Sequence, residues 1–140
     1  MVGRQGARSA SGRDHSDATT GAFALFSVPR YERKIEQVDT LTTPALGLVE
    51  TAGAIARRTG SELLARRACR AIERLPNVLV VVPDGALWNA ALGAAAARSL
   101  RGADAVYVAL ADLLQLPLVT WDREQRERAG RRVRVIAPAR

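Results

Sequence analysis

Leu100-Arg-Gly-Ala-Asp104-Ala-Val-Tyr-Val-Ala-Leu-Ala-Asp-Leu-Leu-Gln-Leu-Pro-Leu-Val-Thr120-Trp-Asp122 is the stretch that decides the fold. It predicts a helix that begins near Asp104, a turn that contains Pro117, and a short apolar strand that ends just before Asp122. In an open α/β sheet, ligands bind outside the carboxyl ends of the strands, and Asp122 would lie at such an edge. Asp104 and Asp122 can therefore converge there, where carboxylates suit a hard divalent cation.

Strands alternate with helices in the rest of the chain, which favours a mainly parallel sheet. The run Val78 to Val82 is rich in β-branched residues without alternation and predicts a buried strand. Thr43-Pro44 predicts a helix N-cap followed by the first helical residue. The other expected elements are helices over 44–58, 61–75, 85–99 (capped by Asp84) and 123–129, and a final strand over 133–136.

The length of 140 residues predicts one domain, which we place at residues 14–140. Residues 1–13 contain almost nothing to bury and are expected to be disordered. Residues 14–28 predict a first helix that ends at Pro29. Cys69 is the single cysteine, so no intrachain disulfide can form, and no apolar run approaches the roughly 20 residues of a membrane span. With no secretory signal evident, these features predict a cytoplasmic protein.

The chain is basic, with 21 Lys and Arg against 14 Asp and Glu, and nearly all of the positive charge is arginine. Arginine favours phosphate through its planar fork, so the charge is compatible with a nucleic-acid partner. A G+C-rich genome would also enrich arginine, and the arginines between Arg123 and Arg134 could equally be a solvated face. Charge alone therefore does not decide the function.

Glu50 is a third candidate acid, because its helical neighbours three and four positions away are uncharged. A carboxylate on an apolar face must be neutralised, paired or bound to metal. Each acid alone has an ordinary explanation: Glu50 an exposed or paired glutamate, Asp104 a first-turn aspartate, and Asp122 a helix cap. Together they indicate a site that holds one or two Mg²⁺ or Mn²⁺ ions for phosphodiester cleavage. Thr120 could orient Asp122 or a water molecule there.

Three blocks together resemble a PIN domain: Thr43-Pro44-Ala-Leu-Gly-Leu-Val-Glu50-Thr-Ala-Gly-Ala-Ile-Ala-Arg57-Arg58, Leu100-Arg-Gly-Ala-Asp104-Ala-Val-Tyr-Val-Ala-Leu-Ala, and Leu118-Val-Thr-Trp-Asp122-Arg-Glu-Gln. They are most similar to VapC-type toxin ribonucleases of toxin–antitoxin systems. The resemblance implies a three-layer α/β/α domain, Mg²⁺- or Mn²⁺-dependent cleavage of RNA, a homodimer and inhibition by a small VapB-type antitoxin. It implies that Glu50, Asp104 and Asp122 take the second, third and fourth acidic positions of the family.

The start of the chain departs from this pattern. PIN domains open with an apolar strand that ends in an aspartate, and residues 1–13 contain no such strand. We therefore expect the first strand to be absent, through truncation, a misassigned start or degeneration, together with one metal ligand. The sequence predicts a ribonuclease toxin impaired by this loss. The alternatives are a PIN-like module that binds RNA or an antitoxin without cutting, and a receiver-like signalling domain, against which the missing acidic pair near the first strand counts.

Overall fold

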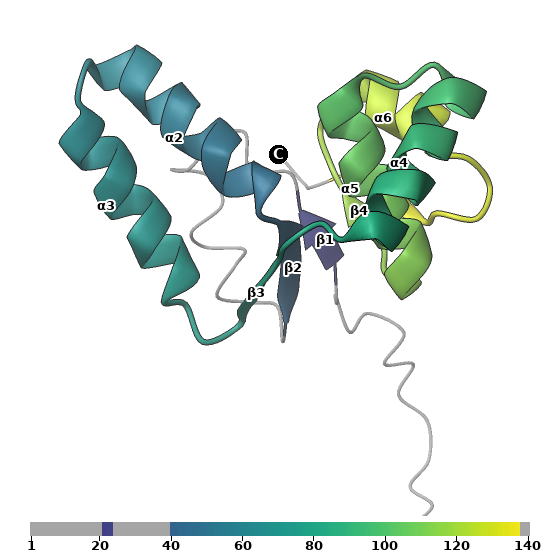
Figure 1. The fold of residues 1–140 in the computed structure, drawn as a ribbon, viewed down its shortest axis with the longest axis horizontal. Helices are drawn as coiled ribbons and strands as arrows, with labels where there is room; N and C mark the ends of the chain where they lie inside the picture. Colours follow the sequence, from purple (N-terminus) through teal and green to yellow (C-terminus); the bar gives the residue numbers. More distant parts are fainter. Residues whose placement is uncertain (1–20, 24–39, 138–140) are drawn as a thin grey trace, which may run out of the picture.

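A parallel sheet of five strands forms the centre of the protein in the computed structural model, which describes residues 21–23 and 40–137 (Figure 1). The strand order is β3-β2-β1-β4-β5, and each neighbouring pair is parallel. Their carboxyl ends therefore meet at one edge. The strands are β1 (Gly21–Phe23), β2 (Leu41–Pro44), β3 (Val78–Val81), β4 (Leu118–Val119) and β5 (Val135–Ile136).

The helices of the described residues lie in two groups on either side of the sheet (Figure 1). One group is the pair α2 (Leu46–Thr59) and α3 (Glu62–Glu73); the other is α4 (Gly85–Arg98), α5 (Gly102–Leu114) and α6 (Arg123–Arg128). Side-chain caps start three of them: Ser61 accepts a hydrogen bond from the Leu64 N–H, Asp84 from the Leu87 N–H, and Asp122 from the Gln125 N–H. The helices predicted over 61–75 and 85–99 are confirmed.

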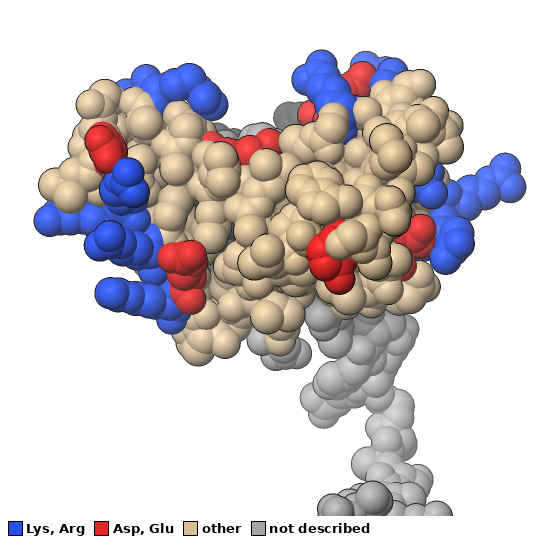
Figure 2. Space-filling model, viewed as in Figure 1, with Lys and Arg blue, Asp and Glu red and all other residues tan. Residues whose placement is uncertain are grey.

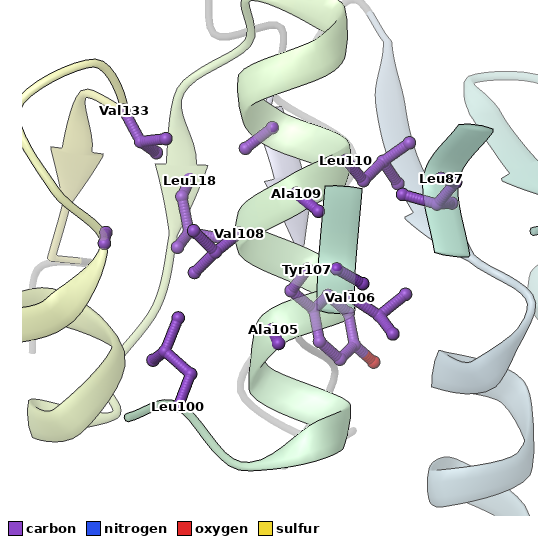
Figure 3. Packing of buried hydrophobic residues seen from close by; sticks show 13 residues of the cluster. Leu87, Leu100, Ala105, Val106, Tyr107, Val108, Ala109, Leu110, Leu118 and Val133 are labelled. Atoms are coloured by element: carbon purple, nitrogen blue, oxygen red, sulfur yellow. The ribbon is translucent and has the colours of Figure 1, made fainter. Parts of the chain in front are cut away.

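Two apolar clusters lie on the two faces of the sheet, and β4 shows the division. Leu118 belongs to a large cluster with α4 and α5, whereas its neighbour Val119 packs with Leu41 and with Ile72 of α3. Successive strand residues point to opposite faces, so helices cover both. The predicted three-layer α/β/α architecture with a parallel sheet is confirmed (Figure 3 shows the large cluster).

The expected absence of a first strand is wrong. Gly21–Phe23 forms β1 at the centre of the sheet, where it pairs with β2 on one side and β4 on the other. Three residues are too few to show a strand period against the helix-like pattern of Ala22, Phe23, Leu25 and Phe26, so the sequence favoured a helix. The helix predicted over 14–28 is wrong at these three positions; its remaining residues, and the segment 1–13, lie outside the described residues.

The Thr43-Pro44 pair ends a strand and does not begin a helix. Both residues are buried in β2, and α2 starts two positions later, at Leu46, after Ala45. The register with β1 reaches only Thr42, so the missing N–H of Pro44 falls beyond the paired residues on that side. The chain turns into the helix at Ala45, whose N–H donates to the carbonyl of Val81.

The predicted buried strand at Val78 to Val82 exists but lies at an edge of the sheet, and Leu79 and Val82 are exposed. Among the residues that the structure describes, no helix has the length and apolar character needed to cross a membrane.

Candidate metal-binding site

The three predicted acids come from elements that meet at the carboxyl edge of the sheet. Glu50 lies in the second turn of α2, directly after β2, and Asp122 follows β4 after Thr120 and Trp121. Asp104 lies in the first turn of α5, a helix that precedes β4 and therefore starts at the edge where β4 ends. Figure 2 shows a notch at this edge, between α2 and the group of α4, α5 and α6, with acidic side chains on its floor.

Glu50 is held from across this notch by Tyr107 of α5. The Tyr107 hydroxyl donates a hydrogen bond to Glu50 Oε2 over 2.8 Å. Tyr107 is fully buried within the large apolar cluster, whereas Glu50 is half-buried. A residue of α5 therefore fixes the position of Glu50, which lies on α2 in the other group of helices.

Gln125 links the other two acids. Its side-chain Nε2 donates to Asp104 Oδ1 over 2.7 Å, and its backbone N–H donates to Asp122 Oδ1 over 2.8 Å. Gln125 is fully buried, and its Oε1 has no hydrogen-bond partner among the described residues. The second bond makes Asp122 the N-cap of α6, the ordinary explanation considered for it above.

Thr120 supports Asp122 through the backbone. The Thr120 hydroxyl, which is buried, accepts a hydrogen bond from the Asp122 N–H over 3.0 Å. This contact closes the turn that carries Asp122 away from β4, so the bond orients the residue rather than the carboxylate directly.

Burial and a neighbouring acid raise the pKa of both Glu50 and Asp104. Burial raises the pKa of the Glu50 carboxyl; the Tyr107 hydrogen bond lowers it, and the charge of Asp104 raises it further. Burial also raises the pKa of Asp104; the Gln125 bond lowers it, Asp122 raises it, Arg101 lowers it and Glu124 raises it. Carboxylates that are partly desolvated and repel one another are stabilised by a cation placed between them.

The donor chemistry fits Mg²⁺ or Mn²⁺, because each acid offers carboxylate oxygen and the described hydrogen bonds engage one oxygen of each. The set is not a closed cage: within residues 21–23 and 40–137, no group of three or more His, Cys, Asp or Glu side chains is close enough to hold a metal ion. The five residues that follow β1 in the sequence, Ala24-Leu-Phe-Ser-Val28, contain no acid. The assignment of Glu50, Asp104 and Asp122 as ligands thus stays a prediction.

Basic side chains flank the notch on both rims (Figure 2). Arg57 and Arg58 are exposed in the last turn of α2, and Arg123 and Arg126 are exposed on α6. Some of this charge is neutralised locally, since Arg123 forms an ion pair with Glu127 at 2.6 Å. The remainder leaves an acidic floor between positive walls, an arrangement that can draw in a polyanion while a cation holds one of its oxygens.

Sequence reasoning missed Tyr107 and Gln125. Tyr107 falls in an apolar run, where an aromatic residue reads as core, and Gln125 falls in an Arg- and Glu-rich helix, where it reads as surface. A signal was present for each: Tyr107 lies one helical turn after Asp104, and Gln125 lies three residues after Asp122, the position at which an N-cap side chain meets the backbone N–H.

The comparisons with known proteins agree with this architecture. The PIN domain family matches residues 25–131, most of the chain, and the chain therefore belongs to that family. Among solved structures, PAE2754 from Pyrobaculum aerophilum is similar with a TM-score of 0.65 and 22% identity, over 85% of this chain and 90% of that one.

A toxin–antitoxin complex from Klebsiella pneumoniae is similar with a TM-score of 0.55 and 16% identity, over 74% of this chain and 87% of that one. At these identities the two structures support the fold. No curated protein matched the chain by sequence.

Proposed function

We propose that the chain is a metal-dependent endoribonuclease of the VapC toxin type, weakened by the lack of an acid after β1. The observation that carries the proposal is that Glu50, Asp104 and Asp122 come from elements that meet at one sheet edge, where the charge of Asp104 raises the pKa of Glu50 and the charge of Asp122 raises the pKa of Asp104. Membership of the PIN domain family supports nuclease chemistry at this edge.

Glu50, Asp104 and Asp122 would hold Mg²⁺ or Mn²⁺, which when bound supplies a Lewis acid and an activated water for phosphodiester cleavage. The protein's own residues do the rest. Gln125 and Thr120 keep Asp104 and Asp122 in place through the hydrogen bonds described above. Arginines on both rims attract the RNA backbone.

The biological setting is part of the proposal. The similarity to a toxin–antitoxin complex from Klebsiella pneumoniae supports a small VapB-type antitoxin as partner. We expect a homodimer, as the VapC resemblance implies, and a cytoplasmic location, as the single cysteine suggests. Light scattering of the purified chain, alone and with a candidate VapB-type antitoxin, measures both associations.

The decisive experiment is cleavage of single-stranded RNA with Mn²⁺, with and without EDTA. Asp104→Asn should abolish cleavage, because an amide is a poorer and uncharged ligand. The matched control is Asp112→Asn on the same helix, because Asp112 pairs with Arg132 at 3.3 Å far along α5 from the notch. Cleavage that survives both EDTA and Asp104→Asn would overturn the proposal.

A second candidate is a PIN domain that binds RNA or antitoxin without cutting. The absence of a three-ligand metal group among the described residues favours it. The test is to insert an acid directly after β1 with Ala24→Asp. Under our proposal this variant binds Mn²⁺ more tightly and cuts faster, since divalent affinity rises with the number of charged ligands. Equal affinity and equal rates would show that another acid already fills the role, and binding of RNA without cleavage in both forms would favour the second candidate.

A further inference from the structure

Tyr107 is both a core residue and a hydrogen-bond donor to one of the candidate metal ligands. Its ring is fully buried in the large apolar cluster (Figure 3). Its hydroxyl lies at the edge of that cluster and donates a hydrogen bond to the carboxylate of Glu50 on α2. A buried tyrosine hydroxyl needs a partner, and any carbonyl would serve. The partner here is one of the acids at the notch.

Room for this contact depends on Gly47. A Cβ atom at this position would lie 2.8 Å from the Tyr107 hydroxyl and 2.6 Å from the Thr43 Oγ1, both closer than side-chain carbons approach such atoms. Gly47 lies one turn before Glu50 on α2, and its φ angle is not in the left-handed region, so the glycine is not needed for backbone conformation. The position is left small so that α5 can reach α2.

Thr43 adds a second polar contact at the same place. Burial and then the charge of Glu50 raise the pKa of the Tyr107 phenol, whereas a hydrogen bond with the Thr43 side chain lowers it. Thr43 is fully buried at the end of β2. The Tyr107 hydroxyl thus lies between a strand end and the acid on the following helix, and its direction is set from two sides.

We propose that Tyr107 is a positioning residue that holds Glu50 Oε2, so that the other carboxylate oxygen of Glu50 is available to a divalent cation at the notch. This inference rests on the proposed function for the role of Glu50. The phenol contributes no charge, so it restricts the side-chain rotamers of Glu50 without competing with the cation. Partners that orient a ligand in this way typically change metal affinity by about 10- to 100-fold.

The test compares Mn²⁺ binding, measured by electron paramagnetic resonance, in wild type, Tyr107→Phe, Gly47→Ala and Glu50→Gln. Tyr107→Phe removes one hydroxyl and should weaken binding about tenfold. Gly47→Ala should weaken it in the same direction by displacing the phenol. The matched control is Cys69→Ala, which removes a different side-chain contact to α2, the Cys69 Sγ hydrogen bond to the Leu48 carbonyl, and should leave Mn²⁺ affinity unchanged.

The Glu50→Gln background separates this inference from the proposed function. If Glu50→Gln weakens Mn²⁺ binding and Tyr107→Phe does not, the positioning role is overturned and the metal role of Glu50 stands. If Glu50→Gln has no effect, the proposed role of Glu50 fails. Where both act, Tyr107→Phe should have no further effect on Mn²⁺ binding once Glu50 is replaced.

A metal-free measurement decides the contact even for a wild type that binds Mn²⁺ too weakly to titrate. The shifts in the urea midpoint caused by Tyr107→Phe and by Glu50→Ala should be non-additive in the double variant, because each substitution alone removes the same hydrogen bond. Additive shifts would overturn the inference, since they would show that the phenol and the carboxylate do not interact in solution.

Discussion

The two sides of the notch are built differently. The side formed by α4, α5 and β4 contains a cluster of thirteen buried residues, which includes every residue of α5 from Ala105 to Ala111. On the other side, the described residues of α2 and α3 include few buried ones, and the described part of their cluster with the sheet contains Leu41, Ile72 and Val119. Leu63 and Leu64 on α3 are 58% and 50% exposed.

This difference separates the acids as well. Asp104 and Asp122 belong to the densely packed side, where Gln125 connects them, whereas Glu50 belongs to the thinly packed side and is tied to the other by Tyr107. Local stability follows the amount of buried apolar contact. We therefore infer that Asp104 and Asp122 are fixed by the core, whereas Glu50 is held, among the described residues, by the Tyr107 hydrogen bond across the notch.

The largest expected effect tests this contrast with one kind of substitution on each side. Leu118 is 0% exposed in the large cluster, and Leu118→Ala should cost about 2–5 kcal/mol of unfolding free energy through lost burial and a cavity. Leu64 is 50% exposed on α3, and Leu64→Ala should change stability by less than about 0.5 kcal/mol. Urea unfolding monitored by circular dichroism measures both, and similar losses would contradict the contrast.

Gln125 offers the next largest effect. Gln125→Glu would bury a second carboxyl against Asp104 and replace a donor with an acceptor, which should cost about 1.5–3 kcal/mol, the range for a hydrogen bond to a charged group. Gln125→Met is the control, because it also removes the Nε2 donor but eliminates the unpaired Oε1 and adds no charge. Its cost in urea unfolding should be smaller than that of the glutamate. If the glutamate variant is as stable as wild type, the Asp104 contact is not formed.

Two glycines of α2 give opposite expectations for the same change. Gly47→Ala should destabilise by about 1–3 kcal/mol, because its Cβ would collide with the buried Thr43 and Tyr107 hydroxyls. At Gly53 the nearest atom to an added Cβ is the flexible Arg57 guanidinium, 3.1 Å away, so Gly53→Ala should stabilise the helix by up to about 1 kcal/mol. Thermal melts of the pair compare them directly. A stabilising Gly47→Ala would show that α5 does not approach α2 this closely.

The features of the fold that local sequence patterns specify were predictable, and those set by pairing between distant segments were not. The parallel α/β architecture, the caps at Ser61 and Asp84, and the carboxyl-edge placement of Asp122 come from local patterns, and these signals are strong. β1 was missed because three residues carry no period; its place is set by pairing with β2 and β4. Thr43-Pro44 was misassigned because a strand end and a helix start share the same residue types.

Contacts between residues far apart in the chain could not be predicted from the sequence either. The Tyr107 to Glu50 bond joins positions 57 residues apart, and no property of either residue type specifies the other. The small residue at Gly47 acquires its meaning only when α5 is placed against α2.

The smallest expected effect concerns the one acid that depends on the contact across the notch. The pKa of the Glu50 carboxyl is raised, first by burial, so in the metal-free protein the folded state holds this proton more tightly than the unfolded chain does. Between the unfolded and the folded pKa, unfolding releases protons, and the free energy of unfolding falls as the pH rises. Glu50 therefore costs stability at neutral pH, and acidification through this window removes the cost.

Glu50→Gln removes that charge while keeping an oxygen that can accept the Tyr107 hydrogen bond. The metal-free variant should melt higher than wild type at neutral pH, and the difference should shrink as acidification lets the Glu50 carboxyl of the wild type take up its proton. Added Mn²⁺ should reverse the order at neutral pH, because the cation stabilises the carboxylate form and binds the variant more weakly. A variant that melts lower than wild type at neutral pH without metal would mean that Glu50 is already compensated by a positive group. The inference that the Glu50 carboxylate needs a bound cation to be stabilised would then be wrong.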